Sequence, residues 1–459
     1  MLLFFFKRKE AERPVRSMDA REVSLLALND CQRQGGWSDA ILKKRLASAG
    51  LDSRDGALAT QLCFGVLQNR MLLDFYLSHF SNLPLKRMEG RVVEALRLGA
   101  YQMLFLDRIP HSAAVNASVE LTRKHCKNPR AAGMVNGILR NLERNLESLP
   151  TIPQTDPVSY LSTVYSHPEW LVRELLTALG SEETAKLLAA NNGRAPMTAM
   201  VNRTRTTVQD LLQSLEGEGV QARPHPWLAD CLILEKTGNL ERLTAFQEGL
   251  FYIQDPASRL AVEALSAGPG MRVLDCCAAP GGKSFAAAIC MEGRGEVVSC
   301  DLHPHKKKLI QAGADRLGLS NITPMTADGK VFRPEWENAF DRVLVDAPCS
   351  GLGVIRKKPD IRYKDRSPLL DLPKVQREIL ATAARYVKPN SLLVYSTCTL
   401  LRRENEGVVE DFLRCHPEYK AEAFTLPEPV GFVGDGRVTL WPHRQGTDGF
   451  FISRFRREG

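Results

Sequence analysis

The sequence predicts a multidomain protein with an all-helical first part, a small α/β part and a large α/β part. The large part is expected to have a doubly wound, mainly parallel sheet with an antiparallel edge strand. Three observations support this prediction. The chain has 459 residues, more than one ordinary domain holds. Its apolar residues follow a helical period over residues 17–150. From about residue 245, strand, loop and helix patterns alternate, which is typical of parallel α/β sheets.

The composition is that of a globular protein with a basic tilt. Hydrophobic residues make up 44% and charged residues 25% of the chain, enough to bury a full core. Lys and Arg number 61 against 53 Asp and Glu, a formal charge of +8, which favours a polyanionic partner without identifying one. The 11 cysteines include no CxxC pair, so we expect reduced thiols, a cytoplasmic location and no metal site.

The first 16 residues are expected to be a disordered tail. Their apolar run, residues 2–6, is far shorter than the roughly 20 residues of a membrane span. It also lacks the charged start and cleavage site of a signal peptide. We therefore expect no membrane association, and a mis-assigned start ahead of Met18 is an equally good explanation of the tail.

The helical part, residues 17–150, reads as a bundle. Ser17 is a candidate N-cap for the first helix, and further helices are predicted over residues 58–80, 91–106 and 112–124. Two stretches in this part, IPHSAAVNASVELTRK and AAGMVNGILRNL, resemble the paired signature helices of NusB-type domains. The resemblance implies a NusB-like, RNA-binding domain.

Basic residues cluster twice in this domain, over residues 123–130 and at Arg140 and Arg144. The clusters could form a stripe that faces RNA phosphates. Ordinary solvated helix faces would look the same in the sequence.

Residues 151–163 are rich in proline, threonine and serine and predict a linker. Residues 164–244 then predict a small α/β subdomain. Two amphipathic helices, with Ser181 as the expected cap of the second, precede strand-like AMVNRTR and CLILEK, which flank the helix TVQDLLQSLEG. The composition of this subdomain does not indicate its function.

The large α/β part, residues 245–459, begins with a strand that ends in the loop AAPGGK. The loop's glycines let the backbone approach a ligand at a helix start, but the spacing is not GxGxxG, which disfavours a pyrophosphate. Asp301 and Asp328 end the next two strands, where carboxylates can bind ribose hydroxyls and an adenine amino group. Each alone could be a helix cap or turn residue. Together these features fit S-adenosylmethionine.

Two further apolar strands, residues 340–348 and 391–399, end in polar turns that carry Asp346, Cys349 and Cys398. If the strands are neighbours in a parallel sheet, both thiols emerge at its carboxyl edge, where such sheets bind ligands. A single cysteine is more often part of the core. Two thiols in polar turns at adjacent strand ends indicate chemistry instead.

This set of groups suits methylation of a pyrimidine carbon. The DAPC turn differs from the D/N-P-P-Y loop with which methyltransferases position an amino group. Because C5 is a poor nucleophile, a thiolate must first add to C6. An acid must protonate or hydrogen-bond N3 and the amino group, and the elimination needs help. Cys398, Asp346 and Cys349 supply these groups, and Lys283 or Arg356 would favour a thiolate.

Four longer motifs carry a second resemblance. They are similar to the motif series of the bacterial RNA cytosine-C5 methyltransferases, which implies a Rossmann-like class I methyltransferase domain. The motifs are VLDCCAAPGGKS, DAPCSGLGVIRKKPDIRY, YSTCTLLRRENE and QDPASRLAVEAL. With a NusB-like domain in front, the chain resembles the small-subunit (16S) rRNA branch of that family, called the RsmB or Sun type.

The resemblance also implies roles for single residues. Cys398, in the TC motif, would be the nucleophile, Cys349, in the PC motif, would assist product release, and Asp346 and Lys283 would complete the catalytic group. The implied partner is small-subunit rRNA, bound by a monomer. Contacts to S-adenosylmethionine are implied at Cys277, Ala278, Ala279, Pro280, Gly281, Gly282, Lys283, Asp301, Asp328 and Asp346.

The segment 356–367 follows the DAPC turn directly and contains six basic residues. It could hold RNA phosphates while Tyr363 stacks on an unpaired base, or it could be a solvated charged loop. The candidate RNA contacts are Arg356, Lys357, Lys358, Arg362 and Tyr363.

Two other functions stay open. One is the same chemistry on tRNA. The other is an RNA-binding ribosome assembly factor with an inactive methyltransferase fold, which is disfavoured because both cysteines, the glycine-rich loop and the three acids are all retained.

Overall fold

A computed structural model describes residues 18–34, 37–128 and 130–459. The chain divides into two compact units. The first comprises the described residues up to Asp156 with Ser162–Ser166, and the second comprises Pro157–Leu161 and His167–Gly459. Among the described residues, no helix combines the length and apolarity needed to cross a bilayer. The expected tail and the Ser17 cap lie outside the described residues.

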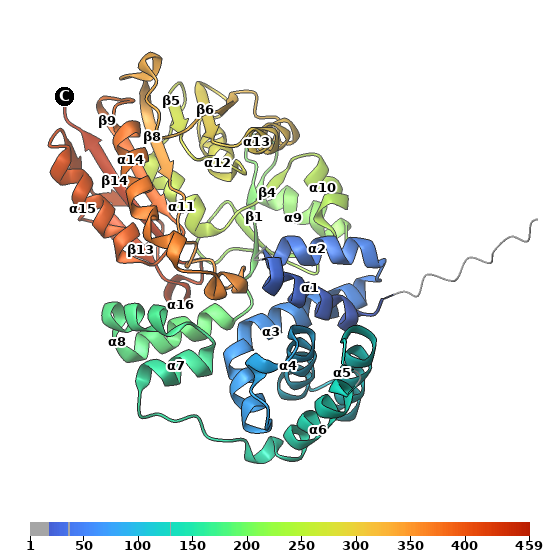
Figure 1. Ribbon diagram of the computed structural model, residues 1–459. Coiled ribbons are helices and arrows are strands. Elements are labelled where there is room, and N and C mark those ends of the chain that lie inside the picture. Colours follow the sequence, from blue (N-terminus) through green and yellow to red (C-terminus); the bar gives the residue numbers. More distant parts are fainter. Residues whose placement is uncertain (1–17, 35–36, 129) are drawn as a thin grey trace, which may run out of the picture. The chain divides into compact units, whose positions relative to one another are not determined.

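The first unit is a helical bundle (Figure 1). Its fourth helix is buried along most of its length because other helices surround it. Gly99 permits this close packing, since a Cβ there would lie 2.6 Å from the side chain of Leu139. The helices are α1 (Ala20–Gln34), α2 (Ser38–Ala49), α3 (Ser53–His79), α4 (Gly90–Phe105), α5 (His111–His125) and α6 (Ala131–Arg144). The all-α prediction for this part is confirmed.

A seventh helix, α7 (Pro157–Tyr165), corrects the predicted linker. Residues 151–156 are not helical, but residues 157–163 are. Proline at the first position of a helix costs no hydrogen bond and presets the backbone angle. The same proline that indicated a linker in the sequence therefore begins a helix.

The small subdomain of the second unit has a four-stranded antiparallel sheet of order β2-β3-β1-β4. Before it, α8 (Glu169–Asn192) breaks at Gly180, whose φ is 75°, one residue before the expected cap Ser181. The remaining elements are β1 (Met197–Val201), α9 (Val208–Gly217), β2 (Gln221–Pro224), β3 (Cys231–Glu235), α10 (Thr244–Gln247) and β4 (Phe251–Ile253). Because β4 pairs with β1, this sheet extends beyond the boundary expected at residue 245.

The large sheet has the order β10-β14-β9-β8-β5-β6-β7, with β13 beside β14. Strands β5 to β9 are parallel, whereas β14 runs antiparallel to β9, so the predicted sheet with an antiparallel strand towards its edge is confirmed. The strands are β5 (Arg272–Asp275), β6 (Glu296–Asp301), β7 (Ile322–Thr326), β8 (Phe340–Asp346), β9 (Val387–Thr397), β10 (Tyr419–Ala421), β13 (Arg437–Leu440) and β14 (Phe450–Arg457).

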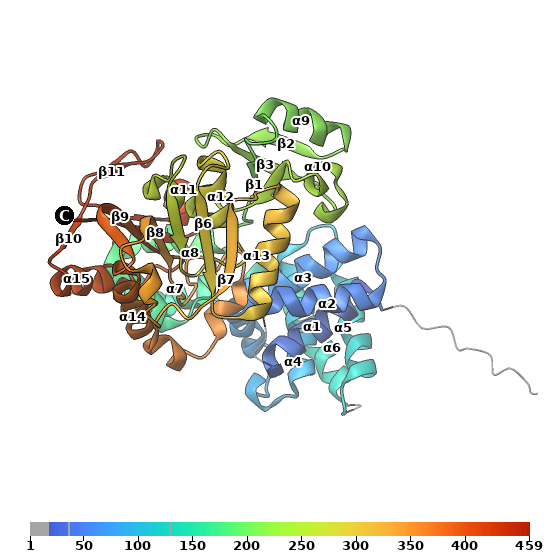
Figure 2. The same cartoon turned by 90° about the horizontal axis from the view of Figure 1, so that it is seen from above.

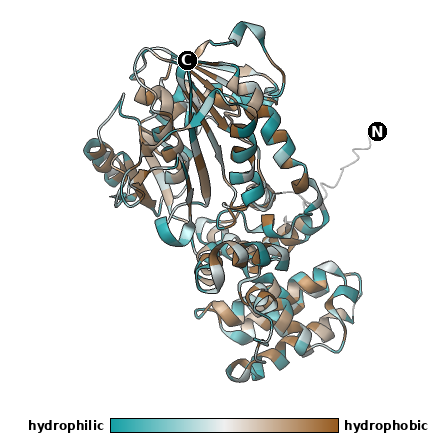
Figure 3. Cartoon of the chain, turned by 90° about the vertical axis from the view of Figure 1, so that its left-hand side faces the viewer, coloured by the Kyte–Doolittle hydropathy of each residue, from teal (hydrophilic) through white to brown (hydrophobic). Residues whose placement is uncertain are grey.

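Helices cover both faces of this sheet (Figure 2). Side chains alternate between the faces, so Val273 packs in the core under α11, α12 and α13, while Leu274 packs in the core under α14 and α15. Burial on both faces explains why the central parts of the parallel strands are mainly apolar (Figure 3). The helices are α11 (Pro256–Leu265), α12 (Gly282–Cys290), α13 (Pro304–Leu317), α14 (Leu372–Ala384) and α15 (Glu406–Cys415).

Short elements complete the C-terminal region. The segment between β13 and β14 contains a helical turn, α16 (Pro442–Gln445). A small hairpin joins β11 (Phe424–Thr425) and β12 (Phe432–Val433).

Candidate active site

The glycine-rich loop joins β5 to α12. Gly281 has a φ of 115°, and a Cβ there would lie 2.4 Å from the ring of Phe285, so only glycine fits without a shift. The backbone N–H of Ala278 donates to the Cys300 carbonyl at the end of β6 (2.7 Å). The loop is thereby tied across the sheet edge, and the first N–H groups of α12 become available to a ligand.

A buried network of hydrogen-bonded polar side chains supports this loop. The Ser284 hydroxyl donates to Asp275 Oδ2 (2.8 Å) and lies 2.7 Å from the Ser299 hydroxyl. Burial raises the pKa of Asp275 to about 7, and within the described part of the chain its Oδ1 has no hydrogen-bond partner. Sequence reasoning missed Asp275, although it ends its strand as Asp301 does.

Asp301 and Asp328 lie at the ends of β6 and β7, as expected. Asp301 Oδ1 accepts from the backbone N–H of His303 (3.2 Å) and lies 3.4 Å from Lys306 Nζ, and Asp328 Oδ1 accepts from the Lys330 N–H (3.0 Å). Leu302, next to Asp301, is 53% exposed. This apolar side chain at a polar edge is a second residue that sequence reasoning missed.

On the other half of the edge, Lys283 and Asp346 form an ion pair. Lys283 Nζ lies 2.7 Å from Asp346 Oδ2, and the Ser396 hydroxyl donates to Asp346 Oδ1 (2.8 Å). Burial opposes the charge of Lys283, but the Asp346 carboxylate outweighs burial and the pKa of Lys283 rises. The pair joins α12, β8 and β9, with both carboxylate oxygens held in place.

The two cysteines meet next to this pair. Asp346 of β8 pairs in register with Ser396 of β9, and the Sγ atoms of Cys349 and Cys398 lie 3.2 Å apart. The predicted adjacency of the strands and of the two thiols is confirmed. The hydrogen bond with Cys398, together with burial, raises the pKa of the Cys349 thiol well above its usual range. Cys349 is therefore a neutral thiol in this state.

Two close backbone contacts hold the loops that carry the thiols. The Gly353 N–H donates to the Cys398 carbonyl, and the Gly449 N–H donates to the Gly353 carbonyl, both at 2.9 Å. A Cβ at Gly353 would lie 1.9 Å from the Gly449 oxygen. Glu404 adds a further support, because its Oε2 accepts from the Ser350 N–H (2.9 Å).

Comparisons with known proteins agree with these motifs. Family models match for "16S rRNA methyltransferase RsmB/F" over residues 262–456, for the NusB family over residues 18–144, and for an RsmF/B-like ferredoxin-like domain over residues 167–241. The probable ribosomal RNA small subunit methyltransferase B of Bacillus subtilis is 40% identical over 97% of this chain and 100% of its own length. The chain belongs to the RsmB/F family of 16S rRNA methyltransferases.

Further known proteins are similar as well. Ribosomal RNA small subunit methyltransferase B of Vibrio cholerae is 34% identical over 87% of this chain and 89% of its own. The crystal structure of PH0851 shares the fold, with a TM-score of 0.79 and 24% identity over 96% of this chain and 99% of that chain. NSun6 from Pyrococcus horikoshii, solved with SFG, has a TM-score of 0.56 and 21% identity over 64% of this chain and 98% of that chain.

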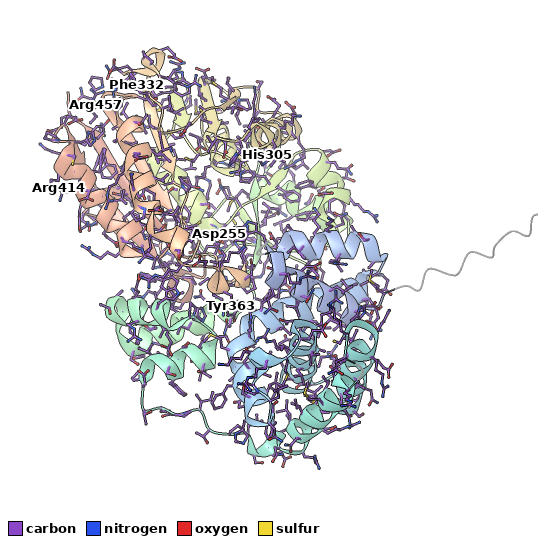
Figure 4. The ribbon with its side chains drawn as sticks, in the orientation of Figure 1. Asp255, His305, Phe332, Tyr363, Arg414 and Arg457 are labelled. Carbon is purple, nitrogen blue, oxygen red and sulfur yellow. The ribbon has the colours of Figure 1, made fainter. Side chains whose placement is uncertain are left out.

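In this RsmB/F protein the basic segment 356–367 does not form a free loop. Lys357 Nζ bridges Asp255 Oδ2 (2.6 Å) and Asp448 Oδ2 (2.8 Å), and burial raises the pKa of Asp448 to about 7. Arg356 donates to the Gly446 carbonyl (3.0 Å), and its side chain is 7% exposed. Figure 4 labels Asp255 and Tyr363 in this region.

The second half of the segment is a short 3-10 helix, Pro359–Tyr363. Arg362 in it is 2% exposed and donates to Asn192 Oδ1 (2.8 Å), and burial lowers its pKa to about 10. Lys358 and Tyr363 are half-buried. The charges of Arg356, Lys357 and Arg362 thus contact protein groups, contrary to the expectation of a phosphate-facing loop.

Of the two cations expected near the thiols, Lys283 interacts electrostatically with Cys398, whereas Arg356 pairs with Asp448 (3.8 Å). Over the described ranges, no group of three or more His, Cys, Asp or Glu side chains could hold a metal ion.

Proposed function

We propose that this protein transfers a methyl group from S-adenosylmethionine to C5 of a cytosine in 16S rRNA through a covalent bond between Cys398 and C6. The single observation that carries the proposal is the pair of thiols 3.2 Å apart at the ends of β8 and β9. Carbon methylation at C5 requires a nucleophile at C6 and a second group for the elimination, whereas methylation of a nitrogen or oxygen requires neither.

The cofactor half of the edge supports this proposal. The loop from Cys277 to Lys283, with Asp301 and Asp328, would hold S-adenosylmethionine, and the buried, unpartnered Oδ1 of Asp275 suits a cationic ligand. When bound, S-adenosylmethionine supplies a methyl group activated by its positive sulfonium.

The first chemical step belongs to Cys398 and Asp346. The Cys398 thiolate adds to C6. Lys283 passes a proton to the Asp346 carboxylate, and Asp346 passes that proton to N3 and hydrogen-bonds the amino group. Lys283, 2.7 Å from Asp346, holds this carboxyl group in place and is near enough to supply the proton. The addition makes C5 an enamine-like carbon that can accept the methyl group.

Cys349 then assists release of the product. Its pKa is raised first of all by the hydrogen bond with Cys398. Once the Cys398 sulfur is bonded to C6 it is a neutral thioether, so this cause disappears and Cys349 loses its proton more readily. Cys349 passes its proton to water and, as a thiolate, takes the C5 proton. The electrons of the C5–H bond re-form the C5–C6 double bond, Cys398 leaves as a thiolate, and N3 returns its proton to Asp346.

RNA with tritium at cytosine C5 tests the proposal directly. We expect the protein to release one tritium for each methyl group transferred, since C5 exchanges its hydrogen for methyl. Methyl transfer without tritium release would contradict the proposal, because it would place the methyl group on a nitrogen or on the ribose. Bisulfite sequencing of rRNA and tRNA from cells that lack the protein would locate the target and separate rRNA from tRNA.

A further inference from the structure

A cavity of about 830 Å³ lies in the second unit, next to the loop that follows Cys398. Its walls come from α8, α15, β13 and the loop that follows Cys398, and α8 runs next to α16 (Figure 1). We call it the Trp–Arg pocket, after the residues Trp170, Arg173, Arg366, Arg402, Arg437 and Trp441. Ligand pockets span about 300–1,000 Å³, so its size suits one nucleotide.

The lining combines stacking surfaces with cations. The guanidinium of Arg366 lies 4.7 Å from the ring centre of Trp170. The side chains of Arg173 and Arg402 are 66% and 71% exposed, so a ligand can reach them from solvent, although each also pairs with a glutamate. Aromatic faces and arginines together are the groups with which proteins hold single-stranded nucleic acid.

The pocket also contains acceptors. Glu174 lies 2.9 Å from Arg403 and 3.4 Å from Arg366, and Glu410 lies 2.8 Å from Arg402. Four arginines and three glutamates line the cavity. Carboxylates in such a position can accept from the amino group of a base, while the excess positive charge favours a phosphate.

The pocket adjoins the nucleophile along the chain. Leu400 and Leu401 belong to its wall, and the Cα atom of Leu400 is at most about 7.6 Å from that of Cys398, since consecutive Cα atoms are 3.8 Å apart. Arg366 comes from the basic segment that follows Cys349. A strand with its target base at Cys398 can therefore reach the pocket with the next nucleotide.

We propose that the Trp–Arg pocket binds the unpaired nucleotide that adjoins the target cytosine in the RNA strand. The base stacks on Trp170 or Trp441, and Arg173 and Arg402 contact its phosphates. Extrusion of the target leaves its neighbour without a stacking partner, and a tryptophan face replaces it. The inference rests on the function proposed above and adds a nucleotide-binding subsite to it.

Short RNAs that contain the unmodified target cytosine provide the test. In one set, the base on either side of the target is replaced by an abasic residue. With the unmodified protein, loss of the base that occupies the pocket should raise KM about fivefold or more, the lower limit for one base–aromatic stack. Trp170→Ala and Trp441→Ala should raise KM similarly on intact RNA, with kcat unchanged, and at least one should lose all further sensitivity to the abasic residue.

Phe432→Ala is the matched control, because Phe432 is an aromatic residue 73% exposed outside the pocket lining, and its KM should not change. Arg402→Gln should reduce the slope of KM against salt concentration. Two results would overturn the pocket assignment while C5 methylation persists. One is that the KM increases of both tryptophan variants multiply with those of the abasic RNAs, and the other is that KM does not change at all. Absence of tritium release from every RNA would instead overturn the proposed function itself.

Discussion

The two halves of the sheet's carboxyl edge differ in the groups they present. At the ends of β5, β6 and β7, loop backbone and carboxylates dominate, and Asp275 is buried beneath them. At the ends of β8 and β9, two thiols and an ion pair lie together. Backbone and carboxylates suit binding, whereas thiols suit bond formation. Substitutions in the first half should therefore change affinity, and those in the second should change turnover.

The largest effect is expected for Cys398→Ala. Without a nucleophile, methyl transfer should fall about 10⁴-fold or more, as in other enzymes that lose one, while cofactor affinity measured by calorimetry stays unchanged. Cys415→Ala, at an exposed cysteine, is the control and should transfer normally. Normal transfer by Cys398→Ala would remove the contrast between the two halves.

Cys349→Ala should stall the reaction after addition. Because Cys398 can still attack C6 but release loses its base, a covalent protein–RNA adduct should accumulate as a slow band on a denaturing gel. The double variant Cys349→Ala/Cys398→Ala should form no band. If Cys349→Ala turns over without an adduct, the release role belongs to another group.

Asp301→Ala tests the binding half. Loss of hydrogen bonds to a charged group costs about 1.5–3 kcal/mol, so the cofactor dissociation constant should rise about 10- to 100-fold, with kcat at saturating cofactor unchanged. Glu296→Ala, at the opposite end of β6, should leave the affinity as it is. A fall in kcat with unchanged affinity would move Asp301 to the chemical half.

The smallest effect concerns Asp275 and pH. Its folded-state pKa of about 7 lies above its ordinary value of 3.8, so its contribution to stability is complete below about pH 4 and is lost as the pH rises through 7. Asp275→Asn should therefore show a smaller drop in melting temperature between pH 5 and pH 8 than the unmodified protein, measured without cofactor. Asp448, whose pKa is also about 7, contributes equally to the pH dependence of the unmodified protein and of the variant. Equal drops in melting temperature for the two proteins would contradict a raised pKa of the buried Asp275 carboxyl group.

The strands and turns of the edge were predictable because buried parallel strands leave long apolar runs and their carboxyl ends meet at one edge. The helical first unit was predictable from its period. Residues 157–163 were not, since a proline-rich stretch can be a linker or a helix start. The protein partners of Lys357 and Arg362 were not predictable for a similar reason. A basic residue is expected to be exposed unless its partner is known, and Asp255 and Asn192 are more than a hundred positions away in the chain.

By itself the sequence determined which elements form, which turns carry the acids and thiols, and that Cys349 and Cys398 would meet if their strands were neighbours. Local period and residue type suffice for that. Only the tertiary structure decided which charges turn inward, that Asp275 is buried without a full set of partners, and that two tryptophans enclose a cavity with arginines. Those features depend on contacts between distant segments, and no local pattern in the chain encodes them.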